Sequence, residues 1–158
     1  MDKIIIIYGP TAVGKSDVAI RLAKKIDAEI ISADSMQIYK DLNIGSAKIT
    51  KEEMQGVVHH LLDIKDSLDN FSAYEFCEHC KSAIHDIESR KKNVIICGGT
   101  GLYIKALTEN YNYAQTDKNK DFREKLNKLC NDELYNNLLH VDEVWAKQIG
   151  SGDKKRLI

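Results

Sequence analysis

The stretch Gly9-Pro10-Thr11-Ala12-Val13-Gly14-Lys15-Ser16 decides the fold of this 158-residue chain. It matches the phosphate-binding loop pattern at every fixed position. The apolar, β-branched run Lys3–Tyr8 precedes it and predicts a strand buried on both faces of a parallel sheet. Apolar residues at helical spacing follow over residues 16–26. Strand, glycine-rich turn and helix form the context that such a loop requires.

The loop residues Gly9 to Ser16 are predicted to bind a diphosphate. Backbone N–H groups of a loop of this kind wrap phosphate oxygens, and the following helix directs the positive end of its dipole at them. Lys15 adds a full positive charge, and Ser16 is placed to hold a magnesium ion. Mg²⁺ is therefore the cofactor that the sequence predicts.

The pattern of strand and helix signals continues beyond the loop. Ala28–Ala33 is predicted to be a second strand, Ser72–Lys91 a helix, and Asn93–Cys97 a third strand that leads into Gly98-Gly99-Thr100-Gly101. Alternating strands and helices predict an α/β fold. The expected architecture is a P-loop, nucleotide-kinase-like parallel sheet with helices on both faces, followed by a helical segment after about residue 110.

Asp34 is the carboxylate most clearly placed for chemistry. It stands at the carboxyl end of the second predicted strand, on the edge of the sheet where the phosphate loop is expected. The third strand does not end in the aspartate that holds magnesium in many nucleotide hydrolases, although small-molecule kinases remain possible. From the residues alone, Asp34 is equally a general base and a cap for the segment that follows it.

Composition restricts the class of protein. Hydrophobic residues make up 43% and charged residues 30% of the chain, which argues against a wholly disordered protein. The apolar run Ile4–Ile7 is too short to cross a bilayer, and the expected location is the cytoplasm. Cys77 and Cys80 have the spacing of a redox pair or half a zinc site, but they fall on one apolar face of a predicted helix and are interpreted as core residues.

The formal net charge is −1, so any site for a polyanion must be local. Two basic groups are candidates: Lys118, Lys120, Arg123, Lys125 and Lys128, and Lys147, Lys154, Lys155 and Arg156. Acidic neighbours make a solvated helix face the favoured interpretation of the first group taken alone. Short amphipathic helices are predicted after about Thr108, with Trp145 in the core of a late one.

Several successive motifs give the sequence a specific resemblance. In order and spacing it resembles the tRNA dimethylallyltransferase (tRNA isopentenyltransferase) family over residues 3–158, densely as far as Leu107. The motifs are Gly9 to Ser16, Ile31 to Tyr39, Asn43 to Lys48, His59 to Asp63, and Gly98 to Tyr103.

The resemblance implies roles for individual residues. The loop would hold the diphosphate of dimethylallyl diphosphate, and Asp34 would be the general base on the exocyclic amine of an adenosine beside the anticodon of tRNA. Thr100 would be the second catalytic residue, near the amine and the departing oxygen. The implied tRNA contacts are Asp34, Ser35, Met36, Gln37, Thr100 and Arg123, with Ser35 and Gln37 helping to hold a base flipped out of its stack.

The resemblance also implies a division of the chain. Residues 1–110 would be the catalytic core, 111–145 an incomplete helical insertion that contacts tRNA, and 146–158 a return segment to the core that is cut short. Because the family normally continues past this point, the chain is expected to be C-terminally truncated, with apolar surface exposed near Leu157 and Ile158. The expected state is a monomer without membrane contact.

Three other functions remain open from the sequence. The first is a prenyltransferase that acts on free adenine nucleotides, and the second is a small-molecule kinase that uses ATP. The third is a tRNA-binding module without catalytic activity. The His59-His60 pair is interpreted as structural, because adjacent histidines more often accept and donate structural hydrogen bonds than take part in catalysis.

Overall fold

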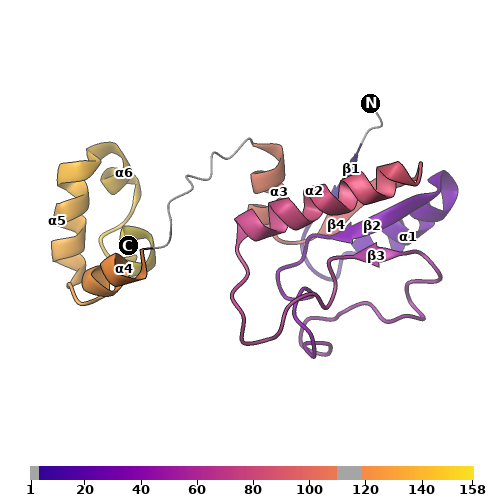
Figure 1. Ribbon diagram of the computed structural model, residues 1–158, viewed down its shortest axis with the longest axis horizontal. Coiled ribbons are helices and arrows are strands. Elements are labelled where there is room, and N and C mark those ends of the chain that lie inside the picture. Colours follow the sequence, from indigo (N-terminus) through magenta and orange to yellow (C-terminus); the bar gives the residue numbers. More distant parts are fainter. Residues whose placement is uncertain (1–3, 110–118) are drawn as a thin grey trace. The chain divides into compact units, whose positions relative to one another are not determined.

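The computed structural model describes residues 4–109 and 119–158 (Figure 1). The sequence predictions for Lys3 and Lys118 lie outside these residues. The chain forms two compact units, Met1–Tyr113 and Ala114–Ile158, and each is described by itself.

The first unit is built on a four-stranded parallel sheet in the order β1-β4-β2-β3. The strands are β1 Ile5–Tyr8, β2 Ala28–Ser32, β3 His59–His60 and β4 Asn93–Gly98. In the register of the sheet, Tyr8 lies beside Gly98 and Ser32 lies beside Cys97. The carboxyl ends of β1, β2 and β4 therefore meet at one edge, as the α/β prediction requires.

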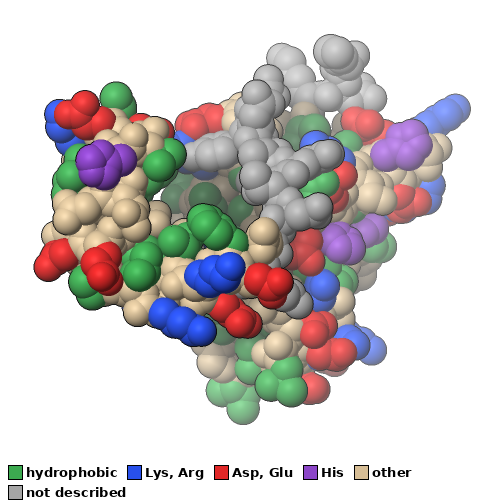
Figure 2. Space-filling model, turned by 60° about the vertical axis from the view of Figure 1, so that its left-hand side comes forward, with side chains coloured by type: hydrophobic (Ala, Val, Ile, Leu, Met, Phe, Trp, Pro, Cys, Tyr) green, Lys and Arg blue, Asp and Glu red, His purple; other side chains and the backbone are tan. Residues whose placement is uncertain are grey.

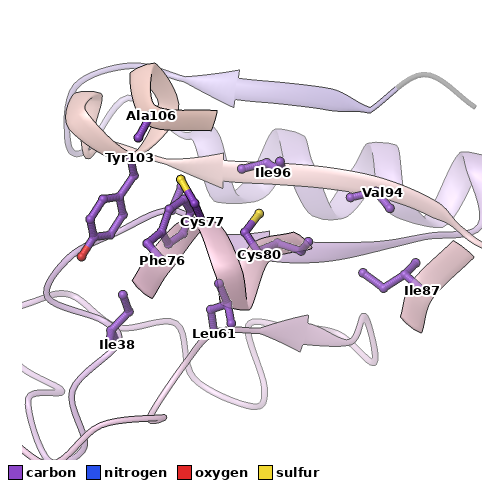
Figure 3. Packing of buried hydrophobic residues seen from close by; sticks show 12 residues of the cluster. Ile38, Leu61, Phe76, Cys77, Cys80, Ile87, Val94, Ile96, Tyr103 and Ala106 are labelled. Atoms are coloured by element: carbon purple, nitrogen blue, oxygen red, sulfur yellow. The ribbon is translucent and has the colours of Figure 1, made fainter. Parts of the chain in front are cut away.

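Helices cover both faces of this sheet. α1 (Lys15–Ile26) packs on the face to which Ile95 and Cys97 of β4 point. α2 (Ala73–Ser89) and α3 (Gly101–Thr108) pack on the other face with Val94 and Ile96 (Figure 3). This alternation is the period-two pattern of a strand buried on both sides. The predicted fold class is confirmed.

The prediction that β1 is buried on both faces is wrong. Ile6 and Tyr8 are 37% and 57% exposed, whereas Ile5 and Ile7 pack against the α1 face. Within the described residues β1 pairs with β4 alone, so it is an edge strand with one open face. The apolar run identifies the strand, but it carries no information about the order of the strands in the sheet.

The interpretation of the cysteines in α2 is confirmed. Cys77 and Cys80 lie in the main core with Phe76 and Ile87, and Figure 3 shows both sulfur atoms inside this cluster. Burial raises the pKa of the Cys80 thiol to about 12, so the thiol stays neutral. Residues 4–109 and 119–158 contain no group of three or more metal-binding side chains of the His, Cys, Asp and Glu types.

The second unit is helical. Its described helices are α4 Lys120–Asn127, α5 Asn131–Val141, α6 Glu143–Gln148 and α7 Lys154–Leu157. Leu134, Ile149 and Leu157 form its own small core. Among the described residues no helix is long and apolar enough to cross a membrane.

Two predictions for this unit are wrong. Trp145 is 52% exposed, because the buried position of the short helix α6 is taken by its neighbour Ala146. Leu157 is only 7% exposed, since it packs on Leu134 and Ile149 within the unit. The apolar residue of the last turn is therefore covered by the same unit.

Candidate active site

The phosphate loop leaves β1 after Tyr8 and enters α1 at Lys15. Ala12 and Gly14 have φ values of 63° and 82°. Left-handed residues of this kind turn successive backbone N–H groups toward one side and form an anion-binding concavity. The ammonium of Lys15 donates a hydrogen bond to Pro10 O, across the mouth of the loop. The loop thus has the backbone geometry and the charge that a diphosphate site needs.

Ser16 is the second residue of α1 and lines a cavity of about 20 Å³. The polar residues that line the cavity are Ser16, Ser32, Gln37, His59 and Cys97. Mg²⁺ binds oxygen ligands and keeps several waters, so one hydroxyl together with diphosphate oxygens is an adequate donor set. The residues present fit a magnesium ion bound mainly through the substrate.

Asp34 follows β2 in a tight turn. Its Oδ1 accepts hydrogen bonds from the backbone N–H groups of Met36 at 2.9 Å and Gln37 at 3.4 Å. This is the capping geometry, and it fixes the direction of the carboxylate while leaving the residue only half-buried. The two interpretations of Asp34 are therefore compatible, because the capping bonds orient the group that would act as a base.

Thr100 stands at the end of β4 and joins Asp34's turn directly. Its backbone N–H donates to Ala33 O at 3.1 Å, and its Oγ1 accepts from the backbone N–H of Ser35 at 2.9 Å. The Thr100 hydroxyl also donates to Ser35 Oγ at 3.2 Å. The structure thus brings together two residues that the sequence predicted to be catalytic partners.

The close approach of the carboxyl ends of β2 and β4 depends on Gly98. A Cβ atom on Gly98 would lie 2.2 Å from Ala33 O, a distance that no side chain tolerates. Because Gly98 has no Cβ, Ala33 N–H reaches Cys97 O at 2.8 Å, and Thr100 comes up beside Ser35. The first glycine of the Gly-Gly-Thr-Gly motif therefore has a packing role.

Gln37 lies between the turn and the phosphate loop. Its amide donates to Ala47 O at 3.4 Å and accepts from Ser32 Oγ at 3.5 Å, and it borders the small cavity beside Ser16. Met36, the residue before it, is 50% exposed. Gln37 is therefore positioned by two segments, whereas Met36 presents its side chain outward.

Lys48 is a site residue to which the sequence analysis gave no role. Its side chain is 5% exposed, and its ammonium donates to Tyr39 O at 2.6 Å and pairs with the carboxylate of Asp63. Backbone bonds from Asp63 N–H to Gln37 O and from Ile64 N–H to Ile38 O join the same segments. The motif Asn43 to Lys48 was the available signal, and its lysine holds the Asp34–Tyr39 loop in place.

Both histidines make hydrogen bonds within the first unit, which is compatible with the structural interpretation. His60 Nε2 lies 2.7 Å from Glu29 Oε2, and Arg90 donates to both oxygens of the same carboxylate. His59 Nδ1 donates to Val57 O at 2.9 Å, and burial lowers the pKa of its ring. Glu29, only 2% exposed, was missed because a single glutamate in an apolar strand gives no signal of its partners.

Arg123 lies on α4 in the second unit. It lines an open depression of about 340 Å³ with Asn127, Lys154, Lys155 and Ile158. One member of the first basic group and two of the last thus line the same depression, and Lys118 lies outside the described residues. On the face shown in Figure 2, Lys and Arg side chains stand beside Asp and Glu side chains and form no continuous basic area.

Comparison with known proteins gives one consistent result. A family model described as IPP transferase matches residues 37–158. The chain is 45% identical over 157 residues to the tRNA dimethylallyltransferase of Anoxybacillus flavithermus, covering 99% of this chain and 50% of that protein. It is 48% identical over 159 residues to the enzyme of the same name from Clostridioides difficile, covering 98% and 51%.

Two solved structures agree with the sequence matches. The tRNA isopentenylpyrophosphate transferase of Bacillus halodurans matches with a TM-score of 0.71 at 38% identity, covering 99% of this chain and 53% of that one. A eukaryotic dimethylallyltransferase acting on tRNA matches with a TM-score of 0.85 at 33% identity, covering 99% and 40%. The chain spans about half the length of the curated relatives it matches. With its phosphate loop, its Asp34 turn and these matches, the chain belongs to the IPP transferase family.

Proposed function

We propose that this chain carries the site for transferring a dimethylallyl group from dimethylallyl diphosphate to the exocyclic amine of the adenosine beside the anticodon of tRNA. The observation that carries the proposal is the junction of Asp34 and Thr100. The two residues meet through Ser35 at the edge of the sheet where the phosphate loop begins. The relatives' names, which state dimethylallyl transfer and action on tRNA, support it.

The phosphate loop would bind the leaving group. Its N–H groups and the N-terminus of α1 would bind the diphosphate, and the Lys15 ammonium would exchange Pro10 O for a phosphate oxygen. Ser16 would hold Mg²⁺, whose charge stabilises the diphosphate as negative charge develops on it. These groups act on the bond that breaks, between the allylic carbon and the diphosphate oxygen.

Asp34 would act on the bond that forms. The amine nitrogen attacks the allylic carbon, the diphosphate leaves with the bonding pair, and the surplus proton of the amine passes to the Asp34 carboxylate. The capping bonds from Met36 and Gln37 hold Oδ1 in place for this role. The Thr100 hydroxyl, now directed at Ser35 Oγ, can rotate toward the amine or the departing oxygen.

The acceptor base must leave its stack to reach such a site. An adenine in a stacked anticodon loop cannot bring its amine to a carbon held beside the phosphate loop, so flipping the nucleotide out is required. Ser35 and Gln37 would help to hold the flipped base, and the exposed Met36 would contact tRNA beside them. In the second unit, Arg123 would contact tRNA phosphates from within the proposed tRNA-contacting segment 111–145, and Lys154 and Lys155 line the same depression from outside that segment.

A prenyl-transfer assay tests the proposal. The chain is incubated with Mg²⁺ and labelled dimethylallyl diphosphate, and the acceptor is either an anticodon stem-loop or AMP. Labelled RNA is the expected product, and D34N is the negative control. Labelling of AMP alone would favour the enzyme of free nucleotides. Thermal protection by ATP but not by dimethylallyl diphosphate would favour the kinase.

A further inference from the structure

Three aromatic rings from two adjacent segments meet beside Asp34's turn. The rings of Phe76 on α2 and Tyr103 on α3 are stacked, with centroids 4.1 Å apart and planes 8° apart. Phe71, just before α2, meets the Tyr103 ring edge-on at 6.4 Å and 74°. Phe76 and Tyr103 are 0% and 4% exposed. Stacked and edge-on pairs at these distances are attractive, so the rings fix α3 against α2.

Tyr103 also belongs to the first turn of α3, and Thr100 is the N-cap residue of this helix. The backbone N–H of Tyr103 donates to Thr100 O at 3.0 Å. On its other side, Thr100 is bound to Ala33 and Ser35. A single helical turn therefore connects the aromatic rings to the hydrogen bond between Thr100 and Ser35.

The phenol of Tyr103 faces the same turn. Figure 3 shows its ring beside Phe76, with the hydroxyl oxygen pointing out of the core cluster. Burial first, and then the nearby Tyr39, Asp34 and Glu75, raise the pKa of the phenol to about 12. The group is therefore neutral near Asp34 at physiological pH.

We propose that Tyr103 is a positioning residue for prenyl transfer, an inference that rests on the function proposed above. Stacking of its ring on Phe76 holds the first turn of α3 in place. The first turn of α3 keeps Thr100 Oγ1 hydrogen-bonded to the backbone N–H of Ser35. It thereby fixes the position of Thr100 relative to Asp34. The ring performs this role and the hydroxyl group does not.

Hydrogen exchange provides a test that does not depend on activity. In the 158-residue chain, Y103L removes the stacked ring, and exchange of the Ser35 amide should accelerate about tenfold, the range for losing one aromatic pair. The Ala33 amide, which donates to Cys97 O, is the internal reference. Y103F keeps the ring and should leave Ser35 exchange unchanged. L102A, at an exposed residue of the same turn, is the matched control. Unchanged Ser35 exchange in Y103L would overturn the proposal.

Kinetics tests the link to the reaction. Y103L should lower kcat by about 10- to 100-fold, the cost of misplacing a reacting group. The KM for dimethylallyl diphosphate should change little, because the phosphate loop follows β1 and does not belong to α3. Y103F, which keeps the ring, should have the kcat of the unmodified chain. In a T100V background Y103L should have almost no further effect. If the fold-losses of kcat in Y103L and T100V multiplied in the double variant, Tyr103 would not act through Thr100.

Two further outcomes are distinguishable. If Y103L does not fold, F76L removes the partner ring instead. It should then accelerate exchange of the Ser35 amide relative to the Ala33 amide. If the unmodified chain transfers no prenyl group to any acceptor, the proposed function fails. The exchange rates would then still decide whether Tyr103 holds Thr100 on Ser35.

Discussion

Thr100 Oγ1 accepts a hydrogen bond from the backbone N–H of Ser35 at 2.9 Å, across 65 residues of sequence. The bond joins the carboxyl ends of β2 and β4 and sets the Asp34 turn beside the glycine-rich turn of the Gly98 to Tyr103 motif. The donor is the backbone N–H of Ser35, which is present whatever the side chain at position 35. The bond therefore depends on an acceptor atom in the side chain of residue 100. The hydroxyl of Thr100 therefore has a structural role beside the chemical role proposed for it.

Replacing Thr100 by valine keeps the shape and removes the hydroxyl. We expect transfer to fall about ten- to a thousand-fold, the range for losing one directed donor, while diphosphate affinity changes little. The free energy of unfolding should fall by about 1 kcal/mol, because the half-buried Ser35 N–H loses its partner. T108V is the control, since Thr108 donates only to carbonyls of its own helix. An unchanged transfer rate in T100V would show that the Thr100 hydroxyl takes no part in the reaction.

Asparagine at position 34 separates the two roles of Asp34. Asn keeps an oxygen that can accept from Met36 N–H, so the turn should persist, but it cannot take a proton from the amine. We expect the transfer rate of D34N to fall by about 10²- to 10⁴-fold, with diphosphate affinity within a few-fold of wild type. D66N, at an exposed aspartate paired with Lys40, should be silent. Wild-type turnover in D34N would remove Asp34 from the mechanism.

We expect Lys15 to contribute to the affinity of the phosphate loop for diphosphate. In K15A the phosphate loop keeps its N–H groups and loses its one ammonium, so affinity for inorganic diphosphate with Mg²⁺ should fall about 10- to 100-fold. Isothermal titration measures this directly. The matched control is K25A, on the exposed last turn of the same helix. Equal affinities of K15A and K25A would contradict the assignment of the loop.

The elements of the first unit were predictable because their signals are local. The phosphate loop is a contiguous motif, and the apolar periodicity of α2 identifies Cys77 and Cys80 as core residues. The exposed face of β1 was not predictable, because it depends on which strands lie beside it. The two-residue strand β3 is too short to leave a periodic pattern.

The sequence motifs named candidate site residues but gave no information on the contacts between them. The motifs named Asp34 and Thr100, yet the bond from Ser35 to Thr100 follows from the pairing of β2 with β4. The buried Lys48 and Glu29 were missed because their partners, Asp63 and Arg90, are distant in sequence. Trp145 was predicted to lie in the core of a late helix, but in the short helix α6 it is exposed and Ala146 takes the buried position.

Gly98 and Gly99 offer a comparison between neighbouring glycines. A Cβ at Gly98 would lie 2.2 Å from Ala33 O, whereas one at Gly99 would lie at an ordinary 3.5 Å from Gly9 O. We expect G98A to lower the free energy of unfolding by about 1–3 kcal/mol or more, because a backbone atom in a sheet cannot move aside cheaply. G99A should fold normally. Urea denaturation measures both, and equal stabilities would mean that the strand ends do not need this close approach.

Glu29 should make the stability of the first unit sensitive to acid. Its carboxylate is buried in β2 and bound by Arg90 and His60, and these partners lower its pKa from 4.5 to about 2. E29Q removes the charge but keeps the size, and at pH 6 it should cost about 2 kcal/mol of unfolding free energy, the range for hydrogen bonds to charged groups. E78Q, which breaks an exposed pair with Lys81, should cost almost nothing.

The sign of the pH dependence follows from the direction of the pKa shift of Glu29. Because the folded state holds the carboxylate ionised to a lower pH than the unfolded state does, the unfolded chain takes up the proton first as the pH falls. The contribution of Glu29 is therefore complete above its unfolded pKa of 4.5 and declines between 4.5 and about 2. Subtracting the unfolding free energy of E29Q from that of the wild type between pH 6 and pH 3 isolates it, since the other carboxylates titrate in both proteins. We expect this difference to shrink steadily below pH 4.5. A difference that stays constant over the range would show that Glu29 is not ionised in the folded chain, and that Arg90 and His60 bind it as a neutral group.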